Sequence, residues 1–157
     1  MSASATPAPL LERSDALGAL DAALAGARAG PDGRLLMLGG EAGVGKTSVV
    51  RAFCAEQSAG AFWGNCDALF TPRPLGPVLD LAESIGGELA ATLEGEAQPH
   101  GVAGSMLRDL AEAAPAIVVL EDLHWADEAT LDVVRLLARR VGRGVLVICT
   151  YRDDGLS

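Results

Sequence analysis

The sequence predicts an α/β fold in which a parallel sheet carries helices on both faces. Four short apolar runs alternate along the chain with helical stretches, which is the pattern of parallel strands joined by crossover helices. The first run leads into a glycine-rich loop, and the third ends in two acidic residues. Because open sheets of this kind place their ligands at the carboxyl ends of the strands, both features are expected at one edge of the sheet.

The composition limits the kind of protein this chain can be. Its 157 residues suffice for one domain with a core, and its net charge of −9 argues against a nucleic-acid surface. No apolar run approaches the ~20 residues of a membrane helix. Residues 1–9 are predicted as a flexible leader that lacks the features of a signal peptide, and the three cysteines as buried free thiols. These features favour a soluble, cytoplasmic protein without membrane contact.

The first half of the chain contains two strands and three helical stretches in the predicted fold. Ser14 or Asp15 is expected to cap an amphipathic helix, which ends at Gly30-Pro31-Asp32-Gly33. A buried strand follows over residues 35–38, and a helix continues from the glycine-rich loop. The second strand covers 61–66, and a helix over 78–85 is stopped by Gly86-Gly87.

The second half contains the strongest strand signal of the chain and one further buried strand. A loop is predicted over about 94–104 and a helix from about 102 to 113, before an apolar strand over 116–120. The next helix is expected to be capped by Asp127 and closed by Gly142, and a fourth strand covers 144–150. The connection lengths favour a fourth strand beside the first, which would leave the first strand at the edge of the sheet.

The glycine-rich loop has the complete spacing of a phosphate-binding loop. Backbone N–H groups and a helix N-terminus can surround an anion there, and Gly43 and Gly45 let the backbone approach it closely. Lys46 can reach the β- and γ-phosphates, and the Thr47 hydroxyl can ligate Mg²⁺. The predicted fold is therefore that of a P-loop NTPase, which binds a nucleoside triphosphate or its product. The residues expected to hold the nucleotide are Gly40, Glu41, Ala42, Gly43, Val44, Gly45, Lys46, Thr47 and Ser48.

Two acids and one arginine are the candidates for catalysis. Glu121 and Asp122 follow the third strand, where one carboxylate can face Mg²⁺ and the other the attacking water. Their order leaves the two roles unassigned, so both are candidate metal ligands beside Thr47. Arg152 follows the fourth strand, where a cation can stabilise charge on the transferring phosphoryl group. The surface alternative is that Arg152 pairs with Asp153 or Asp154.

Three residues that follow the tandem acids indicate a catalytic role less clearly than the acids do. Trp125 is predicted to pack in the core rather than to stack on a base, and His124 to orient a neighbour by a hydrogen bond. Asp127 is predicted to cap its helix, although it lies close enough in sequence to support a metal site.

With these residues identified, the chain resembles the nucleotide-binding domain of STAND-class ATPases. The most similar type is the origin-recognition-like AAA domain of large LuxR-type transcriptional regulators and of some cyclases. The segments that carry the resemblance are Leu11-Glu12-Arg13, residues 40–47, residues 66–77, residues 120–127 and residues 150–154. The resemblance implies that Glu12 and Arg13 approach the adenine and ribose and that Arg152 contacts the γ-phosphate. It also implies that ADP holds a resting state and that ATP opens it for self-association.

The resemblance also sets the expected extent of the domain. Residues 10–157 correspond to a P-loop domain of the AAA/STAND type that stops after the fourth core strand, before the fifth strand, lid and helix-turn-helix of the family. We therefore expect a portion of a longer regulator, with DNA binding confined to that longer protein. Two functions compete for this domain, a slow Mg²⁺-dependent ATPase and a nucleotide-gated switch with negligible turnover. A small-molecule phosphotransferase is disfavoured because no arginine-rich lid is visible.

Overall fold

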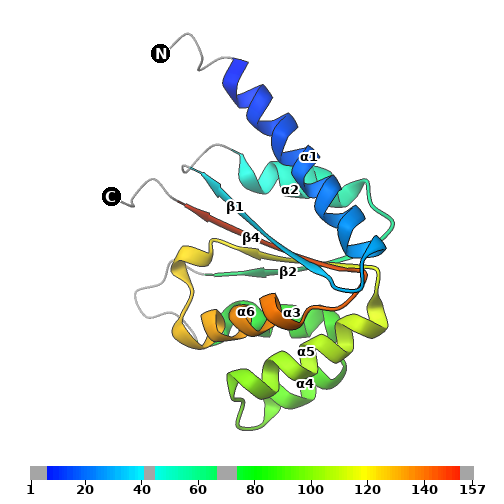
Figure 1. Ribbon diagram of the computed structural model, residues 1–157. Helices are drawn as coiled ribbons and strands as arrows, with labels where there is room; N and C mark the ends of the chain where they lie inside the picture. The colour runs from blue at the N-terminus through cyan, green and yellow to red at the C-terminus, as the bar shows by residue number, and fades with distance from the viewer. Residues whose placement is uncertain (1–6, 41–44, 67–73, 153–157) are drawn as a thin grey trace.

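The computed structural model describes residues 7–40, 45–66 and 74–152, with side chains from Arg13 onward. Its centre is one parallel four-stranded sheet with the strand order β1-β4-β3-β2 (Figure 1). The expected α/β architecture is confirmed, and so is the position of the fourth strand beside the first. The strands are β1 (Arg34–Gly40), β2 (Gly60–Asn65), β3 (Ala116–Glu121) and β4 (Val145–Arg152).

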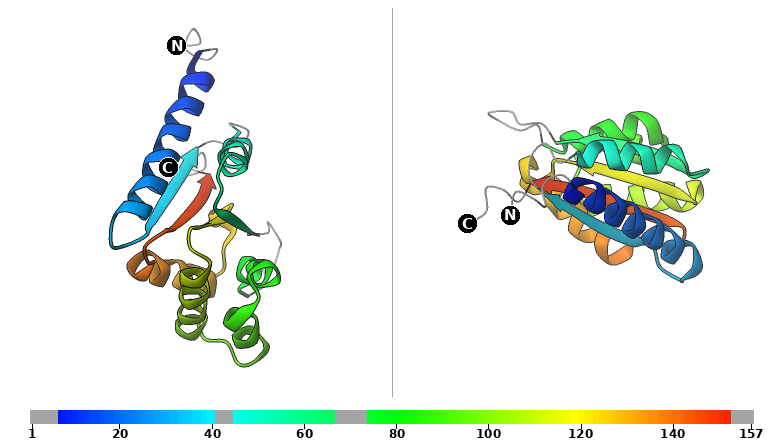
Figure 2. Two further views of the ribbon diagram at one scale, coloured as in Figure 1. Left: turned by 90° about the vertical axis from the view of Figure 1, so that its right-hand side faces the viewer. Right: turned by 90° about the horizontal axis from the view of Figure 1, so that it is seen from above.

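Helices cover both faces of the sheet, as Figures 1 and 2 show. One face carries α1 (Pro7–Ala29) and α2 (Lys46–Ala55). The opposite face carries α3 (Gly76–Ile85), α4 (Gly87–Glu94), α5 (Pro99–Ala113) and α6 (Glu128–Arg140). A short 3₁₀ turn, η2 (Leu123–Trp125), links β3 to α6.

The side chains of β3 divide between two cores. Ile117 and Val119 pack with α1 and α2, whereas Val118 and Leu120 pack with the helices of the other face. Since successive side chains of a strand point to opposite faces, this alternation puts Glu121 on the face covered by α2. The apolar run predicted a strand with helices on both faces, and its alternation also determines which face the Glu121 side chain points to.

The boundaries of α1 and α5 differ from the sequence prediction. α1 already begins at Pro7, so Ser14 and Asp15 lie inside the helix and do not cap it. α5 begins at Pro99, so the predicted loop over 94–104 is wrong in its second half. Proline suits the first position of a helix because its missing N–H would be unsatisfied there in any case.

The sequence prediction missed α4 entirely. Gly86 does end α3, but Gly87 begins the next helix instead of extending the stop. The N-terminal amides of α4 are satisfied from α5, because the Asp109 carboxylate accepts hydrogen bonds from Glu88 N–H (3.1 Å) and Leu89 N–H (2.8 Å). A capping residue 20 positions away leaves no local signal for the start of a helix.

Candidate functional site

The glycine-rich loop ends at the N-terminus of α2. Gly45 has φ 85°, a left-handed conformation that favours glycine, and α2 begins at the next residue. The Lys46 ammonium donates a hydrogen bond to the Gly40 carbonyl oxygen (3.1 Å), which holds the side chain across the two ends of the loop. Thr47 and Ser48 are exposed in the first turn of α2. Glu41, Ala42, Gly43 and Val44 lie outside the described residues.

Glu121 lies opposite this helix terminus, at the end of β3. Its side chain is buried, with 7% of the residue exposed, and it is close enough to Thr47 to accept a hydrogen bond from the hydroxyl. Burial raises the pKa of Glu121 above its ordinary value, and the charge of Asp122 adds to the effect, whereas Thr47 and Arg51 oppose it. Its Oε1 atom has no hydrogen-bond partner among the described residues. A buried carboxylate with an unused oxygen is suited to a cation.

Asp122 leaves the strand in a different conformation from Glu121. Its φ of 59° is in the left-handed region, so the alternation of β3 ends there. Its backbone N–H donates to the hydroxyl oxygen of Thr150 on β4 (3.0 Å), and Thr150 is itself buried. Two neighbouring strands thus fix the backbone at the second acid.

Arg152 lies beside the start of the phosphate loop. In the β1–β4 pairing its register partner is Gly40, and its own side chain is exposed. Its backbone N–H donates to Nδ1 of His124 (3.1 Å), so His124 does act as a hydrogen-bonding neighbour. The expectation for Trp125 is wrong, because this residue is 41% exposed and its ring lies 5.2 Å from that of His124.

The Arg13 side chain reaches the same region from α1. A cavity of ≈330 Å³ separates α1 from the end of β1 and the start of α2. This volume is at the lower end of the range for small-molecule sites. The Glu12 side chain is outside the described residues. The cavity is lined by Arg13, Asp15, Ala16, Leu38, Gly39, Lys46 and Val49.

Asp127 caps α6 as predicted. Its carboxylate accepts hydrogen bonds from the backbone N–H and the hydroxyl of Thr130, and also from the backbone N–H of Leu75 (3.2 Å). Burial acts to raise the pKa of Asp127, but these hydrogen bonds outweigh it, so the pKa lies below its ordinary value. With these donors on its carboxylate, Asp127 joins the starts of α3 and α6.

Arg51 is a neighbour of the site that the sequence prediction missed. It lies four residues after Thr47 on α2, and therefore on the same side of that helix. Its guanidinium carbon is 5.5 Å from the centroid of the Trp63 ring, and its charge lowers the pKa of Glu121. The helical spacing from Thr47 is the signal that could have identified it.

The acids and hydroxyls present fit a magnesium ion better than a metal held by protein ligands alone. The described residues contain no cluster of three or more His, Cys, Asp or Glu side chains that could bind a metal. Mg²⁺ commonly takes one or two carboxylates and completes its shell with phosphate and water. Thr47 and the unused oxygen of Glu121 match that donor set.

Among the described helices, none has the length and apolarity needed to cross a membrane.

Comparisons with known proteins agree with the observed fold. A family described as "AAA ATPase domain" matches residues 9–148. Among solved structures, a chain of the Drosophila ORC bound to AT-rich DNA and Cdc6 is similar, with a TM-score of 0.60 and 14% sequence identity. The match covers 93% of this chain and 48% of that one, so this chain spans about half the length of the similar chain. No curated protein matches the sequence.

Proposed function

Because this chain belongs to the AAA ATPase family, we propose that it is the Mg²⁺-dependent, slowly hydrolysing ATP-binding domain of a signalling ATPase. The observation that carries the proposal is the approach of Glu121 to Thr47 across the gap between β3 and α2. The N-terminus of α2 and Lys46, which is held at the ends of the loop, would bind the phosphates of the nucleotide. The buried Glu121 carboxylate, with its unused oxygen, lies beside them.

The divergent backbones of the two acids support different roles for them. Glu121 faces Thr47 and would hold Mg²⁺ together with that hydroxyl, and Asp122 would orient the attacking water. The metal, when bound, neutralises charge on the β- and γ-phosphates. Arg152, the register partner of Gly40, would contact the γ-phosphate. Arg13 would lie near the base or ribose, with Glu12 beside it in sequence.

Nucleotide binding is tested with Lys46→Ala. At about 100-fold excess of ATP over its Kd, binding to the folded state adds about 2.7 kcal/mol to the free energy of unfolding, readable as a rise in Tm. Lys46→Ala should lose this rise, whereas Arg108→Ala should keep it, because Arg108 pairs with Glu88 on the opposite face of the sheet. A full ATP-induced rise in Lys46→Ala would contradict the phosphate-loop assignment.

The roles of the acids are tested with Glu121→Gln and Asp122→Asn. An amide preserves shape but carries no charge. Glu121→Gln should bind ATP with little added effect of Mg²⁺, whereas Asp122→Asn should keep the Mg²⁺ effect and lose single-turnover hydrolysis. Turnover that is unchanged in both variants would place the catalytic acid elsewhere.

A second function, a nucleotide-gated switch with negligible turnover, uses the same binding residues. It is favoured if wild-type protein binds Mg²⁺-ATP but shows no hydrolysis in a single-turnover assay. The motif resemblance supports a longer parent protein, either a LuxR-type cytoplasmic regulator or a cyclase- or kinase-type signalling protein. Sequencing the downstream reading frame for helical repeats and a helix-turn-helix tests that context.

A further inference from the structure

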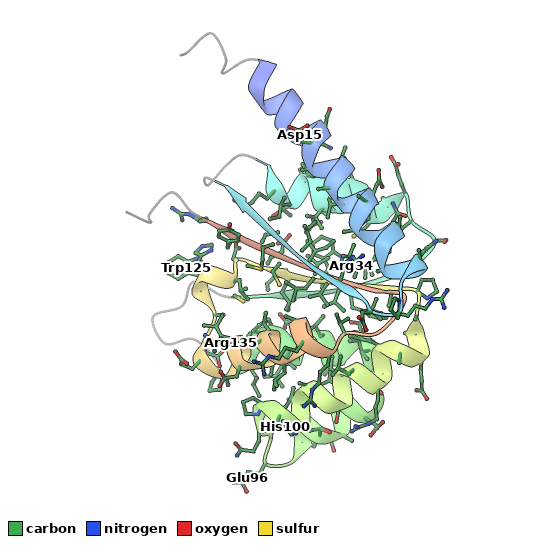
Figure 3. The ribbon with its side chains drawn as sticks, in the orientation of Figure 1. Asp15, Arg34, Glu96, His100, Trp125 and Arg135 are labelled. Carbon is green, nitrogen blue, oxygen red and sulfur yellow. The ribbon has the colours of Figure 1, made fainter. Side chains whose placement is uncertain are left out.

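A second cavity lies on the opposite face of the sheet from α1 and α2. It has a volume of ≈710 Å³ and lies between the start of α5 and the outer side of α6. It shares no residue with the cavity at Lys46. In Figure 3 the labelled side chains of His100 and Arg135 lie on one side of the molecule, below the sheet. The cavity is lined by Gln98, Pro99, His100, Asp132, Arg135, Leu136, Ala138 and Arg139.

The lining combines apolar surface with positive charge. Pro99, Leu136 and Ala138 provide the apolar part, and the Arg135 and Arg139 guanidinium groups come from successive turns of α6. Two of the 12 Lys and Arg residues of this acidic chain thus lie in one lining.

The positive charge is not cancelled within the lining. Asp132 is the one acid there, and it already pairs with Arg135 (2.8 Å). Arg139 makes no ion pair with any described residue. The first turn of α5 adds partial positive charge, since Gln98 makes no capping hydrogen bond with its side chain.

We propose that this cavity binds a small organic acid that has an apolar body and one carboxylate or sulfonate group. The apolar body would lie on Pro99 and Leu136, and the acid group would meet the Arg139 guanidinium, which can form two parallel hydrogen bonds with it. The volume suits a ligand of drug size or smaller. This binding is independent of the nucleotide site and goes beyond the proposed ATPase function.

The test is a calorimetric titration of the 157-residue protein with 2-naphthoate. A separate titration uses the uncharged 2-naphthalenemethanol. The acid should saturate one site and bind up to about fivefold more tightly than the alcohol, the upper value for an exposed charge pair. Arg139→Gln should weaken naphthoate binding by about threefold or more. Ala138→Phe should block it by filling the exposed side of the cavity. The matched control Arg108→Gln removes a guanidinium outside the cavity and should bind like the parent.

Several results would overturn the proposal. These are the absence of saturable naphthoate binding, equal binding of acid and alcohol, or parental affinity in Arg139→Gln. Each variant is first checked for an unchanged Tm, and since Arg139 and Ala138 are exposed, folding should be preserved in both. Sedimentation of the same variants identifies a competing occupant. Self-association that Arg139→Gln abolishes would assign the cavity to a second copy of the chain and would also overturn the proposal.

Discussion

Single residues at the carboxyl edge of the sheet combine properties that are costly outside a functional site. Glu121 is a buried carboxylate with an oxygen that no described residue satisfies, and Asp122 has a left-handed backbone without being glycine. Each feature opposes folding by itself. Their occurrence at consecutive positions, opposite the start of α2, supports a binding role more strongly than either feature alone.

Close backbone contact explains one glycine of β2. A Cβ atom at Gly64 would lie 2.4 Å from the Pro77 carbonyl oxygen at the start of α3. Gly64→Ala should therefore lower the free energy of unfolding by about 1–3 kcal/mol, measured by urea denaturation. Gly60→Ala on the same strand is the control, since its Cβ would have no atom closer than 3.8 Å. Equal effects of the two substitutions would show that α3 does not pack against Gly64 in this way.

At the scale of elements, Asp109 couples α5 to the start of α4. Asp109→Ala leaves two backbone N–H groups without their acceptor, so we expect a loss of about 2–4 kcal/mol in the free energy of unfolding. The half-exposed Asp132 on α6 provides a matched control, because Asp132→Ala removes an ion pair worth at most about 1 kcal/mol. Chemical denaturation of both variants measures the difference. A loss in Asp109→Ala no larger than in Asp132→Ala would contradict the capping role.

The cap of α6 should make stability depend on pH. The pKa of Asp127 is lowered in the folded state from 3.8, so its stabilising effect is complete above that value and fades as the pH falls through the folded-state pKa. Asp127→Ala should cost about 1–2 kcal/mol at pH 7 and less at pH 3. Urea denaturation at both pH values checks this. A deficit that is equal at pH 3 and pH 7 would show that the charge of Asp127 does not contribute.

The sequence predicted the elements whose signals are local, and missed those that depend on distant partners. The four strands, the helix after the glycine-rich loop and the Asp127 cap follow from apolar runs and from residues a few positions apart. α4 depends on Asp109, and the exposure of Trp125 depends on how η2 leaves the sheet. The direction of Glu121 was available in the alternation of β3, but its contact with Thr47 required the packing of α2.

For the whole molecule, the edge position of β1 has a consequence for association. β1 pairs with β4 on one side alone among the described strands, and Met37 is 46% exposed. We expect this edge to promote self-association, because unpaired strand backbone and apolar side chains attract further strands. Met37→Lys should lower the sedimentation-derived association constant, whereas Leu79→Lys, on an exposed position of α3, changes net charge equally and should not. A monomeric wild-type protein would remove the basis for this expectation.

The pairing of β1 with β4 also determines when the phosphate-loop strand can fold during synthesis. Arg34 pairs with Leu146, and Gly40 with Arg152, so the strand that carries the phosphate loop gains this sheet partner only after β4 has left the ribosome. Ribosomes add about 5–20 residues per second, so the loop waits for roughly ten seconds after its own synthesis. A nascent chain should therefore become able to hold nucleotide late and in one step, when β4 inserts between β1 and β3.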